Sequence, residues 1–179
     1  MTTPLTRLLH LVPPPAEAPP ATDWADVERR LGHGLPADYK ELADTYGHGR
    51  FDRHITLLVP EDSRAGQGLI TRNDGYTEEL EDRWEMHEEW PDEVTEEAGT
   101  TLVVWAGTKD AGDLTWLVRP GTPPDSWPVM VFIDDLTEWE TYPLTATAFL
   151  AGLLAGDIDS PILSSELTPP EHTFSPYPR

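Results

Sequence analysis

The segment 23–51 constrains the fold most strongly, because its pattern predicts two short amphipathic helices joined by a glycine-containing turn. Asp23 can accept hydrogen bonds from the free N–H groups of a first helical turn, and Gly32 is suited to end that helix. Its apolar face, at the spacing i, i+3 and i+7, consists of Trp24, Val27 and Leu31. Pro36 suits the first position of the second helix, where its missing N–H costs nothing, and Gly47 follows that helix. The second apolar face consists of Tyr39, Leu42, Ala43 and Tyr46.

Apolar strand patterns downstream predict an antiparallel sheet of four to five strands. The expected strands cover residues 54–59, 101–106, 114–119, 129–133 and 138–142. The later strands should pair antiparallel, because their connections are shorter than the roughly twelve residues that a parallel crossover needs. We expect a turn at 69–75, an acidic helix at 77–90 inserted after the first strand, and a closing C-terminal helix from Thr145 to Leu154. The predicted class is therefore α+β, with two N-terminal helices.

Proline is concentrated at both ends of the chain, where residues 1–20 and 161–179 hold eleven of the nineteen prolines. We therefore expect an N-terminal arm with a proline-rich linker at 1–22, a globular domain at 23–160 and a proline-rich tail at 161–179. Residues 5–12 are either a short helix docked on the domain or a frayed end. In the tail, Phe174 and Tyr177 are the side chains able to pack.

The order of these elements resembles the N-terminal signature of the SUKH superfamily. The residues that carry the resemblance are Trp24, Glu28, Leu35-Pro36, Asp38-Tyr39 and, further along, Trp105-Ala106-Gly107, Trp116 and Trp127. The likeness covers residues 24–157. It implies a role like that of other members: many bacterial ones are immunity proteins that neutralise polymorphic toxins, often nucleases, and fungal ones regulate cell-wall synthesis. The turn Tyr46-Gly47-His48-Gly49 departs from the Asn-Gly type of step more usual in the family.

The formal net charge of −21 limits the classes of partner. Nucleic acid and anionic membranes both need a basic surface, so neither is expected to bind. The charge favours a basic protein partner and a fast, salt-sensitive encounter, although solubility or a GC-rich genome would account for it as well. The chain has no cysteine, which excludes disulfides and thiolate chemistry. Without a run of ~18 apolar residues or a convincing secretion signal, we expect a cytoplasmic bacterial protein.

Residues 78–97 are the strongest candidate for a binding surface, since they contain eleven acidic residues and one Arg. Helical spacing places Leu80, Trp84, Met86, His87 and Trp90 together on an apolar face. The opposite face carries Glu78, Glu81, Asp82, Glu85, Glu88 and Glu89, and Asp92 and Glu93 follow it. Acidic residues at i and i+4 destabilise a helix. The stripe is therefore either a solvated face or a surface that a basic partner covers.

A second acidic group lies around the expected hairpin after residues 129–133. It consists of Asp134, Asp135, Glu138 and Glu140. A carboxylate pair can serve as acid and base in glycoside hydrolysis, but adjacent residues of a strand point to opposite sides. We interpret the group mainly as turn residues, with contact to a partner as the alternative.

No pattern in the chain indicates an enzyme, a metal site or a cofactor. The six histidines lack the spacing that gathers ligands, and His48 is interpreted as a turn residue. No phosphate-binding loop or nucleophile motif occurs. The tryptophans of the predicted elements are interpreted as core, with Trp90 and Trp127, each followed by Pro, expected to be partly exposed.

These observations lead to two functional hypotheses. The first is a non-enzymatic, immunity-type binding protein whose acidic surface covers the basic substrate groove of a toxin, expected to be a nuclease. The second is a housekeeping adaptor or regulator on the same fold, with the terminal arms as interaction segments. The oligomeric state does not follow from the sequence.

Overall fold

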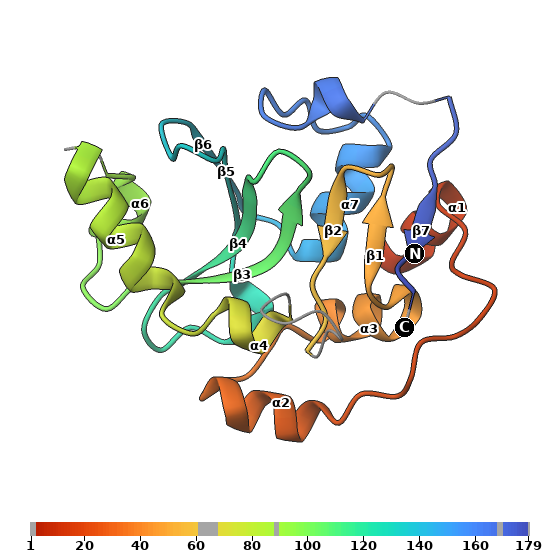
Figure 1. Ribbon diagram of the computed structural model, residues 1–179, viewed down its shortest axis with the longest axis horizontal. Coiled ribbons are helices and arrows are strands. Elements are labelled where there is room, and N and C mark those ends of the chain that lie inside the picture. The colour runs from red at the N-terminus through yellow and green to blue at the C-terminus, as the bar shows by residue number, and fades with distance from the viewer. Residues whose placement is uncertain (1–2, 61–67, 88–89, 168–169, 179) are drawn as a thin grey trace.

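A seven-stranded antiparallel sheet forms the centre of the molecule (Figure 1). The structure is a computed structural model, which describes residues 3–60, 68–87, 90–167 and 170–178. The strands are β1 (Gly49–Phe51), β2 (Ile55–Leu57), β3 (Thr101–Thr108), β4 (Asp113–Val118), β5 (Val129–Phe132), β6 (Trp139–Tyr142) and β7 (Phe174–Pro176). The helices are α1 (Pro4–Leu11), α2 (Trp24–Leu31), α3 (Ala37–Tyr46), α4 (Leu69–Arg72), α5 (Tyr76–His87), α6 (Asp92–Thr95), η1 (Pro124–Ser126), α7 (Ala146–Leu154) and η2 (Ser164–Glu166). The strands lie in the order β6-β5-β4-β3-β2-β1-β7, so the mixed α/β class and the antiparallel sheet are confirmed.

The two helices of segment 23–51 follow the local signals of the sequence. Asp23 accepts a 3.1 Å hydrogen bond from the N–H of Asp26, and Gly32 ends α2 in the left-handed conformation with φ +80°. Helix α3 begins at Ala37 with Pro36 as its N-cap, one residue later than expected. Local capping therefore fixes both ends of α2.

The number of strands was wrong, because β1 and β7 pair across most of the length of the chain. Each has three residues, too few for a period-two pattern, and Gly49 lies opposite Pro176 while Phe51 lies opposite Phe174. A Cβ atom at Gly49 would lie 2.5 Å from the Phe174 ring, so this pairing depends on glycine. The proline-rich tail thus supplies an edge strand, where proline is tolerated.

The N-terminal helix α1 packs against α7 and α3. Leu8 and Val12 are fully buried, and the hydroxyl of Tyr46 donates a 2.7 Å hydrogen bond to the carbonyl of Val12. Of the two alternatives for residues 5–12, the structure shows the docked helix, which precedes the two helices expected at the N-terminus.

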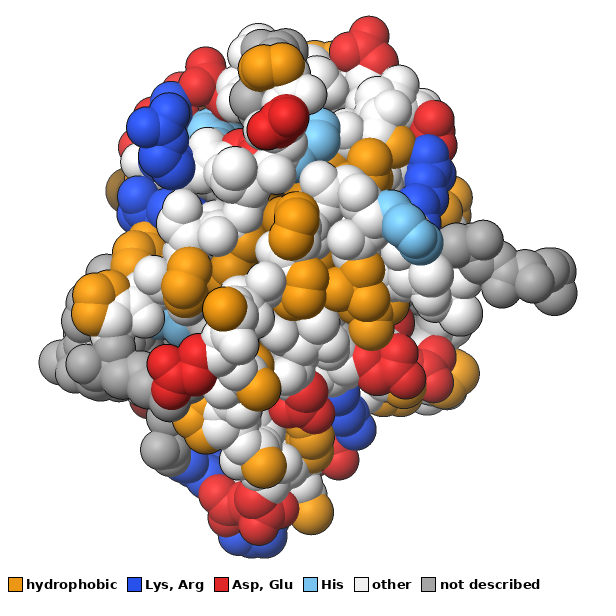
Figure 2. All heavy atoms as spheres, turned by 90° about the vertical axis from the view of Figure 1, so that its right-hand side faces the viewer, with side chains coloured by type: hydrophobic (Ala, Val, Ile, Leu, Met, Phe, Trp, Pro, Cys, Tyr) orange, Lys and Arg blue, Asp and Glu red, His pale blue; other side chains and the backbone are white. Residues whose placement is uncertain are grey.

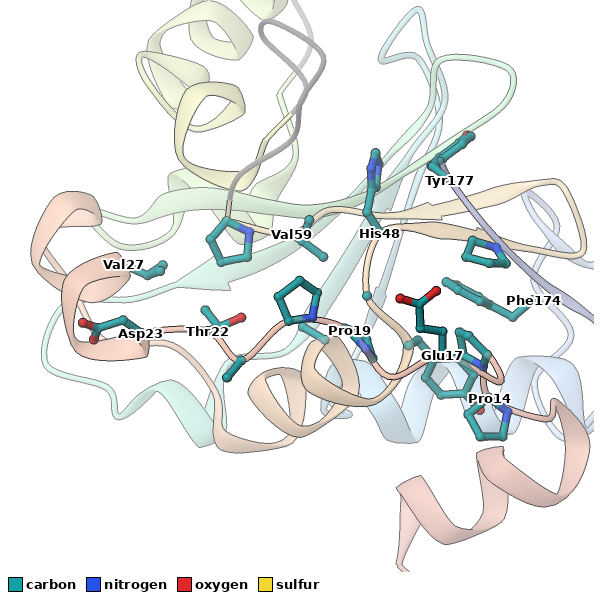
Figure 3. Close-up of a pocket in the computed structure, with 18 of the residues that line it drawn as sticks. Pro14, Glu17, Pro19, Thr22, Asp23, Val27, His48, Val59, Phe174 and Tyr177 are labelled. Carbon is teal, nitrogen blue, oxygen red and sulfur yellow. The ribbon is translucent and has the colours of Figure 1, made fainter. Parts of the chain in front are cut away.

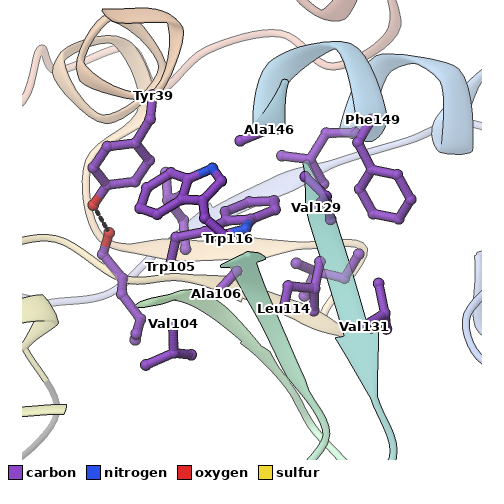
Figure 4. Close-up of a cluster of buried hydrophobic side chains, with 14 of the residues drawn as sticks. Tyr39, Val104, Trp105, Ala106, Leu114, Trp116, Val129, Val131, Ala146 and Phe149 are labelled. Carbon is purple, nitrogen blue, oxygen red and sulfur yellow. Dashed lines mark hydrogen bonds between the residues drawn. The ribbon is translucent and has the colours of Figure 1, made fainter. Parts of the chain in front are cut away.

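The sheet is buried on both faces at its centre. Tyr39 of α3 packs edge-on against Trp116 with ring centroids 4.9 Å apart, and its hydroxyl donates a 2.6 Å hydrogen bond to the carbonyl of Leu58 (Figure 4). Trp105 stacks on Trp116 at 5.9 Å. These contacts confirm the interpretation of the tryptophans as core for Trp105 and Trp116, whereas Trp127 is buried, contrary to expectation.

Two polar side chains cover the part of β3 that extends beyond its short neighbour β2. Asn73 donates to the carbonyl of Val104 and accepts from its N–H, at 2.9 and 2.8 Å. Thr77 makes the equivalent pair of bonds with the backbone of Leu102. These side chains form hydrogen bonds with N–H and C=O groups of β3 that would otherwise be unpaired at an open strand edge. The segment expected as a turn at 69–75 therefore contains the one-turn helix α4 and anchors the start of α5.

Within the described ranges, the helices lack the combination of length and apolar composition that a membrane crossing requires.

Candidate functional site

Helix α5 separates apolar from acidic side chains, as its sequence predicts. Leu80 and Trp84 are buried, and Trp84 packs against Phe132 of β5 with ring centroids 5.5 Å apart. The exposed carboxylates of α5 include Glu78, Glu81, Asp82 and Glu85. Met86 was expected on the apolar face, but its side chain is 76% exposed. The buried face of the helix is therefore narrower than the sequence predicted. The expected helix 77–90 ends at His87, and Glu88 and Glu89 lie outside the described residues.

The short helix α6 continues the acidic surface. Asp92 is exposed, whereas Glu93 is half-buried and its carboxylate accepts a 3.2 Å hydrogen bond from the Thr141 hydroxyl of β6. Val94 is buried beneath them. The contact between Glu93 and Thr141 joins α6 to the β5–β6 hairpin.

The second acidic group forms the turn between β5 and β6, where Asp134, Asp135 and Glu138 are all exposed. The Asp135 carboxylate accepts hydrogen bonds from the N–H and the hydroxyl of Thr137, at 3.0 and 2.7 Å. Leu136 has φ +62°, so the turn is tight. These bonds show that Asp135 has a structural role in the turn.

Glu140 is partly buried and is held by three hydrogen bonds. Its carboxylate accepts hydrogen bonds from the Ser160 hydroxyl at 2.5 Å, the Tyr142 hydroxyl at 2.7 Å and the Ile162 N–H at 2.9 Å. Burial and this hydrogen bond to Glu140 raise the pKa of Tyr142 to about 12. Glu140 therefore orders residues 160–162 and is unsuited to bind a partner.

The structure brings the two predicted acidic groups to one end of the molecule (Figure 1). The Arg83 side chain of α5 donates a hydrogen bond to the backbone carbonyl of Asp134 in the hairpin turn. We call this surface the acidic end and define it by Glu78, Glu81, Asp82, Glu85, Asp92, Glu93, Asp134, Asp135 and Glu138.

In the described part of the chain, the carboxylates of Glu78, Glu81 and Glu85 form no ion pair. Glu79 is also exposed on α5. It was not predicted as part of the acidic face, because helical spacing places it on the side of the apolar residues. Among the described residues, the carboxylates of Glu78, Glu81 and Glu85 therefore carry negative charge that no ion pair neutralises.

The opposite end of the molecule has a different character. Figure 2 shows hydrophobic and uncharged side chains over the centre of that face, with charged side chains mainly around its margin. The acidic end is therefore distinct from the face formed by the terminal segments.

A groove of about 1240 Å³ lies beneath the proline-rich segment that precedes α2 (Figure 3). It is lined by Pro14, Pro19, Tyr46, Phe174 and Tyr177 among others, with Glu17, Asp23 and Asp26 as acidic side chains. The sequence did not predict this groove, because its walls come from both ends of the chain. The proline-rich composition and the two aromatic residues of the tail were the available signals.

His48 lies in this groove with its ring 4.6 Å from that of Tyr177. Asp52, which is close to His48 in sequence, instead accepts a 2.6 Å hydrogen bond from Nδ1 of His172. The turn at 46–49 therefore packs against the tail.

A comparison with protein-family models identifies the family of this chain. Residues 21–150 match the family model SUKH_6, described as SMI1-KNR4 cell-wall. The matched range includes α2, α3, all of the acidic end and strands β1 to β6. No curated protein and no solved structure matches the chain.

Proposed function

The chain belongs to the SMI1-KNR4 cell-wall family of the SUKH superfamily, and from that premise we propose that it neutralises a basic protein toxin by binding it. Membership supports a binding or immunity-type role at the level of the superfamily. The proposed toxin is a nuclease, since the active groove of such an enzyme must attract a polyanion and is therefore basic.

In the proposed mechanism the acidic end covers the substrate groove of the toxin without any chemical step. Carboxylates of α5, α6 and the β5–β6 turn pair with Lys and Arg residues that otherwise hold phosphates. Long-range attraction between the two surfaces raises the association rate, up to roughly 10⁸–10⁹ M⁻¹s⁻¹ at low salt. Fast association matters for immunity, because the toxin must be bound before it reaches its substrate.

The observation that carries this proposal is the convergence of the two acidic groups. They are separated in sequence by three strands, yet the contacts of Arg83 with Asp134 and of Glu93 with Thr141 hold them together. Repulsion among unpaired carboxylates of α5 destabilises that helix by a few tenths of a kcal/mol per i,i+4 pair. A basic partner would remove this cost.

The second candidate function is an adaptor or regulatory protein. It is favoured by the groove between the proline-rich segment and the tail, which a segment of a host protein could enter. In that case the terminal segments, and not the acidic end, would contain the residues that determine binding.

Co-expression with the toxin-like protein encoded beside this chain separates the two functions. We expect the chain to restore growth and to co-purify with that protein. A variant with Glu78→Gln, Glu81→Gln and Glu85→Gln should lose rescue, while a variant altered in the groove at Phe174 and Tyr177 should retain it. Loss of rescue by the groove variant would place toxin binding in the groove and not at the acidic end. Failure of the unmodified chain to rescue or bind would refute neutralisation of that toxin, and stable capture of an unrelated host protein in the same experiment would favour the adaptor.

A further inference from the structure

Among the described residues, one group of three side chains is arranged as a set of metal ligands far from the acidic end. His54 follows β1, Asp110 lies in the turn between β3 and β4, and Glu166 ends η2. Their ligand atoms all lie within 4.8 Å of one another. In Figure 1 the β1–β2 turn, the β3–β4 turn and the segment containing η2 meet at the same edge of the molecule. We propose that His54, Asp110 and Glu166 bind a divalent transition-metal ion of the zinc type.

The strongest observation is the state of His54. His54 is only 3% exposed, and its Nδ1 atom is buried without a hydrogen-bond partner. A buried polar atom without a partner costs about 1–3 kcal/mol, so the structure needs a reason to retain it. Nδ1 lies 3.9 Å from the nearest Asp110 carboxylate oxygen, so it faces the acidic side chains. The backbone of the histidine is also fixed, since its carbonyl accepts a 2.9 Å hydrogen bond from the N–H of Lys109.

The distances fit a zinc ion after a small movement of the carboxylates. Ligands about 2.1 Å from a tetrahedral zinc ion lie about 3.4 Å from each other. The 3.9 Å between Nδ1 of His54 and Asp110 is close to that value. The Asp110 and Glu166 side chains are 66% and 40% exposed, so both can turn toward the ion while the imidazole stays in place.

Lys109 shows that this position already attracts a cation. Its ammonium nitrogen lies 2.6 Å from the Glu166 carboxylate and 4.0 Å from that of Asp110. A metal ion would therefore have to displace the ammonium group, which is 43% exposed and can move into water. This competition makes Lys109 a sensitive test of the proposal, because its removal should strengthen metal binding.

The protonation states favour a metal that accepts both nitrogen and oxygen. Burial and then the charge of Lys109 lower the pKa of His54, although Asp110 and Glu166 oppose the shift, so the imidazole is neutral at pH 7. The hydrogen bond from Lys109 lowers the pKa of the Glu166 carboxyl. One imidazole and two carboxylates suit zinc, whereas calcium and magnesium prefer all-oxygen sites. The positive charge of Arg50 acts on His54 and that of Arg53 acts on Lys109, and both charges limit the affinity of the group for a cation.

The test is a titration of the full, metal-free chain with zinc chloride at pH 7.5, in which calorimetry measures the heat of binding. We expect the unmodified chain to bind one zinc ion. The zinc affinity should be at least tenfold lower in His54→Gln and in Asp110→Asn than in the unmodified chain, and at least tenfold higher in Lys109→Met. The matched control combines Asp134→Asn and Glu138→Gln, which removes two exposed carboxylates from the acidic end and should leave the zinc affinity unchanged.

Cobalt(II) as a second probe reports a change of ligand directly, since its visible spectrum should change in His54→Gln and in Asp110→Asn but not in the acidic-end control. The proposal is overturned if the unmodified chain binds no zinc, if the acidic-end control weakens binding as much as Asp110→Asn, or if Lys109→Met has no effect. Because Asp110 is exposed, its variant remains informative even where His54→Gln destabilises the fold.

Discussion

Thr147 donates two hydrogen bonds to Asp38, a residue 109 positions earlier in the chain, and so joins the first turn of α7 to α3. The N–H of Thr147 lies 2.8 Å from the Asp38 carboxylate, and its hydroxyl lies 3.0 Å from the Asp38 carbonyl. Thr147 is fully buried. Asp38 therefore satisfies one of the free N–H groups at the start of α7, beside the cap that Thr145 provides.

Replacing Asp38 by Ala should lower the free energy of unfolding by about 1–3 kcal/mol, because the buried N–H of Thr147 loses its acceptor. Asp38→Asn keeps an acceptor oxygen and should cost less than about 1 kcal/mol. Urea denaturation followed by tryptophan fluorescence measures both. Equal losses in the two variants would show that the charge of Asp38, and not its hydrogen bond, stabilises this junction.

The pair Asp38-Tyr39 illustrates how much of the fold the sequence predicts. The apolar spacing correctly placed Tyr39 in the core, and caps and glycines correctly placed α2, α3 and α7, because these signals act within a few residues. The partners of the pair, Thr147 and the carbonyl of Leu58, could not be predicted, since they depend on how distant segments pack. The same reason explains the missed strands β1 and β7.

The candidate site shows the same division between local and distant information. Helical periodicity predicted that Glu78, Glu81 and Glu85 would be exposed, and the structure agrees. That α5 lies beside the β5–β6 turn follows from contacts such as Trp84 with Phe132, which no local pattern encodes. The three proposed metal ligands were missed because each comes from a different part of the chain.

Arg72, Tyr76 and Asp113 form a polar cluster between α4, α5 and β4, in which Tyr76 and Asp113 are buried and Arg72 is partly exposed. Arg72 donates hydrogen bonds of 3.2 and 3.0 Å to the two carboxylate oxygens of Asp113, and the Tyr76 hydroxyl donates another of 2.9 Å. Burial raises the pKa of Asp113, although Arg72 and Tyr76 oppose the shift. At a pH between the usual pKa of an aspartate and this raised pKa, the folded state binds more protons than the unfolded state. The contribution of Asp113 to the free energy of unfolding therefore falls as the pH rises through that window.

Arg72→Met should therefore destabilise the protein by about 3 kcal/mol at pH 7, because Asp113 is left charged and only 12% exposed. The loss should shrink as the pH falls through the raised pKa of Asp113, because the carboxyl then becomes protonated. Arg119→Met is a matched control, since the Arg119 side chain is also 36% exposed but its partner Glu96 is on the surface. We expect less than about 1 kcal/mol for the control. A pH-independent loss in Arg72→Met would contradict the role given to Asp113.

His54 should make the stability of the metal-free protein pH-dependent. Burial lowers its pKa below the usual 6.5, so between the lowered value and 6.5 the unfolded state binds more protons. The free energy of unfolding should fall by up to about 1.4 kcal/mol from this group between pH 7.5 and 5.5. In the presence of a chelator, the slope of stability against pH should be flatter in His54→Gln than in the unmodified chain; identical slopes would refute the prediction.

The acidic end should control how fast a basic partner associates. The triple variant Glu78→Gln, Glu81→Gln and Glu85→Gln should reduce the association rate about tenfold at low salt and flatten its dependence on salt, with a smaller change in dissociation. Stopped-flow fluorescence with the toxin-like partner measures both rates. The variant should also be slightly more stable, because like charges along α5 are removed, so slower binding cannot be attributed to unfolding.

A charge-matched control determines whether position or net charge is responsible. Glu41→Gln, Asp159→Asn and Glu171→Gln remove three exposed carboxylates that lie outside the acidic end. If the acidic end binds the partner, the control should change the association rate by much less than the α5 variant, because its charges are not part of the interface and salt screens interactions beyond a Debye length of about 8 Å. Equal effects of the two variants would mean that net charge alone steers the encounter and that the face of α5 is only solvated.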